Sequence, residues 1–172
     1  RMGLNIEQLI IGSNSNDILT RFFEQGRMEM TGVEPTISPS MDIQISSNFE
    51  RLLFELYGRD GHVIKTMMDT FNDTGSFDVG EAEMAKALEL FSAARFSDDE
   101  TRETIAHVFD VAGELLDPHS AIGVAAGRAK RQNADTPLVE LAPAPPAKFP
   151  HAVKAARGPH PDLPATFSAM FA

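Results

Sequence analysis

The sequence predicts an α/β protein in which a few parallel strands are flanked by many helices. An apolar run at 6–11 stops at Gly12-Ser13-Asn14, as buried parallel strands do where a loop begins. A second candidate strand covers 138–142, and apolar side chains between the two strands recur at helical spacing. Two or three strands are too few for a stable sheet of this kind, so we expect a segment outside the chain to supply others.

The first third of the chain is predicted to contain two helices around an irregular stretch. One helix follows the first strand and ends at Gly26, a residue suited to a left-handed helix end. Residues 32–45 are expected to be irregular because two prolines interrupt them. Ser47 and Glu50 then form a capping-box pattern, in which each side chain bonds the main chain of the other at a helix start.

Two further helices are expected in the middle of the chain. The first covers 62–71, and a short extended piece separates it from the second, at 81–91. The spacing of Met84, Leu88 and Phe91 predicts that these side chains face the core.

Two further helices are expected after residue 96, and the second of them is rich in small residues. Ser97 and Glu100 form a second capping box ahead of an amphipathic helix. A helix from about 120 to 131 follows, and its Gly123 and Gly127 would let it approach a sheet closely.

Composition removes several classes of function. The formal net charge of −10 opposes binding to a phosphate backbone, so no nucleic-acid partner is expected. The chain has 0 cysteines, which excludes disulfides, thiolate metal sites and cysteine nucleophiles and fits a cytoplasmic protein. No apolar run has the length of a membrane span, and no spacing of ligands predicts a metal site.

His119 and Ser120 are the first candidates for chemistry, at the start of the last long helix. A neighbouring serine and histidine can indicate nucleophilic catalysis, but adjacent side chains rarely have triad geometry and no acid partner is evident. The structural alternative is that Ser120 caps the helix while His119 packs or bonds to the main chain. A helix start also favours an electronegative ligand atom, to which Ser120 can offer its hydroxyl.

Three other residues are weaker candidates. Lys148 follows the second predicted strand, and α/β sheets place ligands beyond the carboxyl ends of their strands. The alternative for Lys148 is an ordinary surface lysine. Ser47 and Asn48 belong to a hydroxyl-rich stretch for which turns and a helix cap are the favoured interpretation.

Several motifs, in the same order, resemble those of the threonine synthase family. The matching stretches are 12–19, 35–43, 46–55, 117–123 (Asp-Pro-His-Ser-Ala-Ile-Gly) and 146–150 (Pro-Ala-Lys-Phe-Pro). Together they extend over nearly the whole chain. One departure is that Pro143-Ala144-Pro145 stands where the family usually has Thr-Ala-His, so any polar role of those family residues is in doubt here.

The resemblance implies the carboxy-terminal part of a fold-type II pyridoxal-phosphate enzyme. Such an enzyme converts O-phospho-L-homoserine and water to L-threonine and phosphate, and the cofactor serves as electron sink. The resemblance places Ser120 opposite the pyridine nitrogen, where a neutral hydroxyl does not enforce a pyridinium as a carboxylate would. His119 would support this loop, and Ser47, Asn48 and Lys148 would face the substrate.

The same resemblance implies a division of labour within and beyond the chain. Residues 1–30 and 117–158 would belong to the cofactor-binding α/β domain, and 47–116 would form a mainly helical block. The lysine that anchors pyridoxal phosphate is expected in an amino-terminal portion that would be this chain's partner. Because the sequence starts at Arg1, we expect a piece of a longer protein that is inactive alone. The alternatives are a non-catalytic interaction module derived from such an enzyme, and a related threonine dehydratase.

Overall fold

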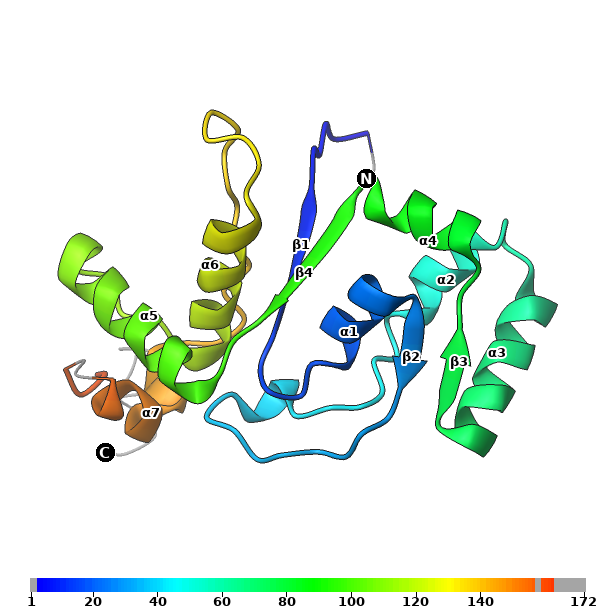
Figure 1. Cartoon of the computed structure of the whole chain (residues 1–172). Helices are drawn as coiled ribbons and strands as arrows, with labels where there is room; N and C mark the ends of the chain where they lie inside the picture. Colours follow the sequence, from blue (N-terminus) through cyan, green and yellow to red (C-terminus); the bar gives the residue numbers. More distant parts are fainter. Residues whose placement is uncertain (1–2, 157–158, 163–172) are drawn as a thin grey trace, which may run out of the picture.

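A computed structural model describes residues 3–156 and 159–162 of the chain. Strand β1 (Leu9–Ser13) pairs in parallel with β4 (Phe91–Arg95), from Leu9 opposite Phe91 to Ser13 opposite Arg95. Helix α1 (Ile18–Gln25) covers one side of this pair and α6 (Pro118–Lys130) covers the other (Figure 1). These layers confirm the predicted α/β class.

A second, antiparallel pair of strands lies beyond α1. Strand β2 (Arg27–Glu29) pairs with β3 (Ser76–Asp78), which is the extended piece predicted between two helices. Helix α3 (Gly61–Thr74) packs against β3 on the outer side (Figure 1). Helix α1 ends at Gly26 in the left-handed conformation, as its sequence predicted.

The sequence analysis did not predict strand β4. The helix expected over 81–91 ends earlier, as α4 (Glu81–Leu88), and Phe91 begins the strand instead. The inward orientation expected of Leu88 is wrong, because this side chain is 49% exposed. Residues 91–95 have weak strand propensity, and pairing with β1 decides their conformation. The predicted helical block therefore also supplies a strand to the parallel pair.

The strand predicted at 138–142 is absent. This segment has no regular structure, and Val139 and Leu141 are 80% and 83% exposed. Its apolar residues have no partner strand among the described residues, and a strand exists only through such pairing.

Helix α6 approaches the sheet through a glycine of the strand, not through its own glycines. A Cβ added to Gly12 of β1 would lie 2.9 Å from Ile122 Cγ2 and 3.1 Å from the Ile122 carbonyl oxygen. Gly123 and Gly127 instead face the side chains of Glu140 and Leu138. The expected use of these two glycines against the sheet is therefore wrong, because they make room for the segment after the helix.

Aromatic side chains fill the core between α1 and its neighbours. Phe22 is fully buried and meets Phe49 edge to face, with ring centroids 4.7 Å apart. Phe23 stacks on Phe91 with centroids 5.6 Å apart, which fixes α1 against β4. Contacts of this kind add to the free energy gained by burying the rings.

The two predicted capping boxes have different outcomes. Ser97 and Glu100 form theirs at the start of α5 (Asp98–Ala112). Ser47 and Glu50 do not, because α2 (Glu50–Leu56) begins after a turn in which the Phe49 N–H donates to the Ser46 carbonyl. Phe49 is buried in the aromatic core, and its placement sets the path of this turn.

The remaining elements are short. Residues 32–45 are irregular as predicted, apart from the 3₁₀ turn η1 (Pro39–Met41). A second 3₁₀ turn, η2 (Pro146–Lys148), precedes α7 (Pro150–Ala155). The predicted boundary at 158 lies outside the described residues. None of the helices in the described part of the chain has the length and apolarity that crossing a bilayer requires.

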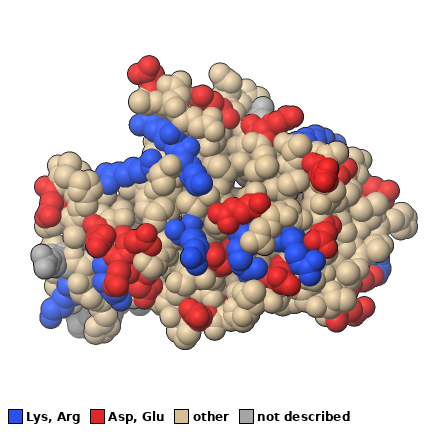
Figure 2. All heavy atoms as spheres, viewed as in Figure 1, with Lys and Arg blue, Asp and Glu red and all other residues tan. Residues whose placement is uncertain are grey.

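Charges of both signs are mixed on one face of this acidic chain (Figure 2). Lys and Arg side chains lie interspersed with Asp and Glu on the face that Figure 2 shows. Several of them pair locally: Arg21 Nε lies 2.9 Å from Asp17, and Arg27 lies 3.0 Å from Asp78 across β2 and β3. The visible face therefore offers no large field of one sign.

Candidate functional site

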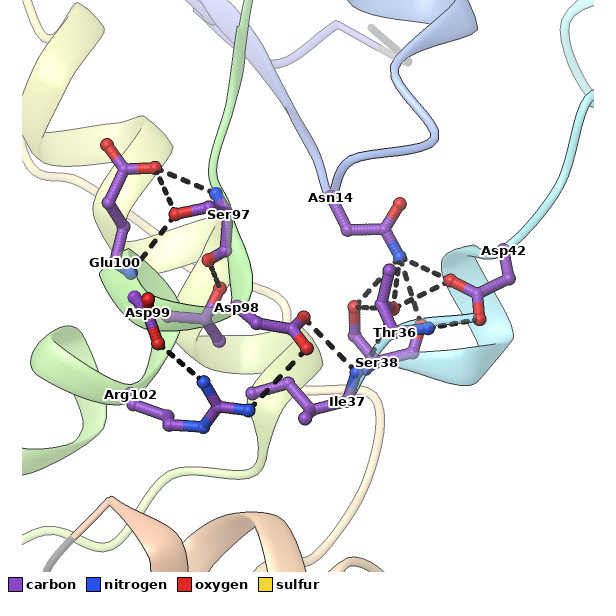
Figure 3. A network of polar contacts seen from close by, with 11 residues as sticks. Asn14, Thr36, Ile37, Ser38, Asp42, Ser97, Asp98, Asp99, Glu100 and Arg102 are labelled. Carbon is purple, nitrogen blue, oxygen red and sulfur yellow. Dashed lines mark hydrogen bonds and ion pairs between the residues drawn. The ribbon is translucent and has the colours of Figure 1, made fainter. Parts of the chain in front are cut away.

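The carboxyl ends of β1 and β4 lie at the same edge of the parallel pair, and the candidate site is built there. The chain leaves β1 at Asn14 and leaves β4 toward Ser97 and α5. The irregular segment 34–42, called here the edge loop, lies against both departures (Figure 3). The ends of parallel strands are where α/β proteins bind ligands.

Asn14 is the centre of the contacts that hold the edge loop. Its side chain is 1% exposed. The amide nitrogen lies 2.8 Å from Thr36 Oγ1, 2.9 Å from Ser38 Oγ and 2.7 Å from Asp42 Oδ1 (Figure 3). The amide oxygen accepts from the Asn16 N–H at 2.8 Å. One side chain at the end of β1 thus fixes three positions of the loop.

Asp42 closes the edge loop on itself. Its carboxylate accepts from the Thr36 N–H at 2.9 Å and from Thr36 Oγ1 at 2.7 Å. Asn14 and Asn16 are two further donors to this carboxylate, at 2.7 and 2.9 Å, and Asn16 also bonds both main-chain groups of Glu34 at 2.8 Å. At the other end, the Ile37 N–H donates to Asp98 of α5 at 3.2 Å.

The start of α6 is capped by Asp117 and not by Ser120. Asp117 accepts from the N–H groups of His119 and Ser120 at 2.9 and 3.3 Å, and Pro118 occupies the first helical position. The expectation of a serine cap is therefore wrong. Asp117 satisfies these amides because a short acidic side chain ahead of a helix reaches them directly.

Three side chains at this helix start form a buried chain of hydrogen bonds. His119 Nδ1 lies 2.8 Å from Asp117 Oδ1, and Ser120 Oγ donates to Asp117 Oδ2. The Ser40 N–H of the edge loop lies 3.2 Å from His119 Nε2. A main-chain N–H can only donate, so Nε2 accepts and the single ring proton of a neutral imidazole lies on Nδ1. The acid partner that the sequence did not reveal is Asp117.

This arrangement does not form a serine nucleophile. The Ser120 hydroxyl bonds to Asp117 and not to His119, and the Nε2 atom that would take its proton is occupied by Ser40. What the arrangement offers is one oriented hydroxyl, held by a carboxylate that the imidazole supports. It is suited to hydrogen bonding with a ligand atom.

Of the three weaker candidates, Lys148 lies near the start of α6 and Ser47 and Asn48 do not. The Phe149 ring packs against His119 with centroids 4.7 Å apart, and Lys148 Nζ lies 5.6 Å from the centroid of the same ring. Ser47 and Asn48 are exposed in the turn before α2, and Asn48 bonds to Arg51. None of their described hydrogen bonds connects them to the start of α6.

Sequence reasoning missed two acidic residues of the site. Asp117 had a signal, since an acidic residue before a proline is a typical helix start. Glu140 had none, because only the fold brings it over α6 beside Gly123. Burial raises the pKa of Glu140, and the negative charge of Asp117 raises it further.

This raised pKa predicts a pH dependence of stability. The folded state favours neutral Glu140. Glu140 therefore contributes to the stability of the folded state below the ordinary carboxyl pKa, and this contribution is lost as pH rises through the raised pKa. Glu140→Gln should therefore raise the melting temperature at pH 7. Thermal unfolding of both proteins from pH 4 to 7 measures this, and the advantage should shrink toward pH 4. An advantage that grows toward pH 4 would contradict the prediction.

Comparison with known proteins identifies the family. Residues 120–172 match the family model of the threonine synthase carboxy-terminal region. Threonine synthase of Pseudomonas aeruginosa is 47% identical over 171 residues, which are 99% of this chain and 36% of that protein. The chain thus spans about a third of the length of the relatives it matches.

Solved structures agree in fold over the same extent. Pyridoxal-phosphate-bound threonine synthase from Brucella melitensis superposes with a TM-score of 0.92 at 54% identity, over 96% of this chain and 36% of that one. Yeast threonine synthase gives 0.84 at 38% identity, over 90% and 34%. Motifs, fold and relatives agree: the chain belongs to the threonine synthase family of fold-type II pyridoxal-phosphate enzymes and corresponds to its carboxy-terminal part.

Proposed function

We propose that the complete protein containing this chain converts O-phospho-L-homoserine and water to L-threonine and phosphate, the last step of threonine biosynthesis. The observation that carries the proposal is the Ser120 hydroxyl, oriented by Asp117 at the head of α6. The family relationship supports the choice of reaction, because the relatives from Pseudomonas aeruginosa and Brucella melitensis described above are named threonine synthases.

The residues of the site fit pyridoxal phosphate in their chemistry. An aromatic nitrogen needs a single hydrogen-bonding atom in the plane of its ring. Ser120 carries one hydroxyl oxygen, which is an atom of this kind. When bound, the cofactor supplies an electron sink for the negative charge that develops on the substrate.

Each candidate site residue of this chain has a distinct role in the proposal. Ser120 bonds and orients the ring nitrogen, and His119 holds Asp117 and the edge loop in place. Lys148, on the Phe149 side of His119, attracts the phosphate of the substrate. Ser47 and Asn48 approach the substrate only if the rest of the enzyme completes their turn, since they lie apart from the start of α6 here.

The remaining functions belong to the rest of the enzyme. We place the Schiff-base lysine and the cofactor phosphate site in the amino-terminal portion, so this chain by itself would be inactive. Residues 1–30 and 117–158 form part of the cofactor domain in this proposal, and 47–116 form the mainly helical block. A cytoplasmic location fits a chain with 0 cysteines.

The test is phosphate release from O-phospho-L-homoserine by the complete protein with pyridoxal phosphate. We expect release of phosphate together with threonine, no activity from this chain alone, and recovery when it is mixed with the amino-terminal portion. Activity on threonine without activity on the phosphorylated substrate would favour a dehydratase instead. Absence of both activities would favour a non-catalytic interaction module.

A further inference from the structure

The base of the edge loop is attached through an amide and two carboxylates. The Asn14 amide nitrogen lies 2.7 Å from Asp42, and Asp42 in turn accepts from the Thr36 N–H at 2.9 Å. Asp98 of α5 accepts from the Ile37 N–H at 3.2 Å. An amide does not titrate, and carboxylates as a class titrate well below neutral pH. The base is therefore expected to stay attached as the pH falls from about 8 to 5.5.

The tip of the edge loop depends on a group of another kind. The tip is the turn η1, and none of its residues is buried. Among the described residues, one hydrogen bond joins this turn to another element, from the Ser40 N–H to His119 Nε2 at 3.2 Å. An imidazole is the side chain that ordinarily gains a proton near neutral pH. The tip is thus attached through a group whose charge can change there.

We propose that His119 is a pH-sensitive switch, which holds the tip of the edge loop at α6 while its ring is neutral and releases the tip when the ring gains a proton. The neutral ring has its proton on Nδ1, 2.8 Å from Asp117 Oδ1, and a lone pair on Nε2 for the Ser40 N–H. A second proton can therefore go only to Nε2. Two N–H groups cannot bond to each other, so the contact with Ser40 is lost while the contact with Asp117 remains.

The charges around His119 allow its ring to become positive. The Asp117 carboxylate touches the ring and would form an ion pair with it, and Phe149 packs on the ring with centroids 4.7 Å apart. Neighbouring elements add further charged or titratable groups: Glu140 over α6, Asp42 in the edge loop, Asp98 and Arg102 on α5, Lys148 before α7, and the exposed His151 and Lys154 on α7. Carboxylates are the majority of the charges named, and negative charge favours a cationic imidazole.

The measurement is NMR of the complete protein, labelled with nitrogen-15 at histidine, serine and threonine, between about pH 8 and 5.5. The ring nitrogens of His119 report the pH at which the ring gains its proton. Hydrogen exchange of the Ser40 N–H, relative to its intrinsic rate at each pH, reports the contact with Nε2. This protection should fall about tenfold over the same pH interval, because one hydrogen bond is lost. Protection of the Thr36 N–H, which Asp42 holds, should not change.

His119→Gln distinguishes the switch from a contact that only supports the fold. The glutamine side-chain oxygen can accept from the Ser40 N–H, as Nε2 does, but it does not titrate. Protection at Ser40 should therefore persist over the whole pH range in this variant. His107→Gln is the matched control, because His107 is exposed on α5 and has no described bond to the edge loop. Its Ser40 protection should fall with pH as in the unaltered protein.

The outcomes separate the switch from the proposed reaction. A His119 ring that stays neutral to about pH 5.5, or Ser40 protection that does not fall as the ring gains its proton, would overturn the inference. So would a fall that persists in His119→Gln, or a simultaneous loss at Thr36, which would indicate general unfolding. If His119→Gln does not fold or does not bond Ser40, the coincidence of the two transitions in the unaltered protein decides. Phosphate release is measured separately, and its absence would refute the proposed function while leaving the switch standing.

Discussion

Asn14→Ala should lower the free energy of unfolding by about 3 kcal/mol, because it removes the side chain that joins β1 to the edge loop. Asn14 lies within 2.9 Å of polar groups of Thr36, Ser38 and Asp42. These groups are partly or fully buried, so water cannot replace the lost donor at each of them. Equilibrium unfolding in urea measures the change.

The matched control is Asn48→Ala. Asn48 is exposed and, among the residues that the structure describes, bonds only to Arg51 of the next helical turn, so the change should stay within about 0.5 kcal/mol. Hydrogen exchange gives a second measurement, since the Thr36 N–H is protected by Asp42 in the edge loop. Faster exchange at Thr36 is expected in Asn14→Ala only. Equal stabilities of the two variants would show that the edge loop is held by other contacts.

Ser120→Ala in the complete enzyme should lower kcat/KM for O-phospho-L-homoserine by about 10- to 100-fold. Leaving a buried polar group without its hydrogen-bond partner costs about 1–3 kcal/mol, and each 1.36 kcal/mol is about tenfold in rate. The fold should persist, because Asp117 keeps the amides of α6 and the His119 bond. Steady-state phosphate release and the absorption of the bound cofactor are the measurements.

Ser120→Thr is the control for this variant. Threonine keeps the hydroxyl that bonds Asp117, so most of the activity and the cofactor absorption should be retained. A Ser120→Ala enzyme with unchanged rate and unchanged absorption would argue against contact between Ser120 and the ring nitrogen. An equal loss in both variants would point to crowding or packing at the head of α6 and not to the hydroxyl.

The edge of the parallel pair joins segments that are distant in sequence. The edge loop is fixed to the end of β1 through Asn14 and to α5 through Asp98 (Figure 3). It is fixed to α6 through His119. Loop positions are rarely held so fully unless the fold needs them in one place. The edge loop is therefore a second support of the Ser120 hydroxyl, acting through the Ser40 N–H.

The sequence by itself determined the features that depend on neighbours along the chain. The first strand, the helix end at Gly26 and the capping box of Ser97 all follow from local chemistry, and the structure has each of them, although this strand covers Leu9–Ser13 and not the predicted 6–11. The Asp-Pro-His-Ser stretch at 117–120 likewise indicated the family, because a motif needs no tertiary contact to be recognised.

Tertiary structure alone decided the features that depend on distant partners. Residues 91–95 are a strand because β1 pairs with them, and 138–142 are not, because the described chain offers them no partner. The role of His119 depends on Ser40, which reaches it only in the folded chain. The role of Glu140 depends in the same way on Asp117. Pairing and burial are free energies of contact, and contacts between remote segments are set by packing of the whole molecule and not by local preference.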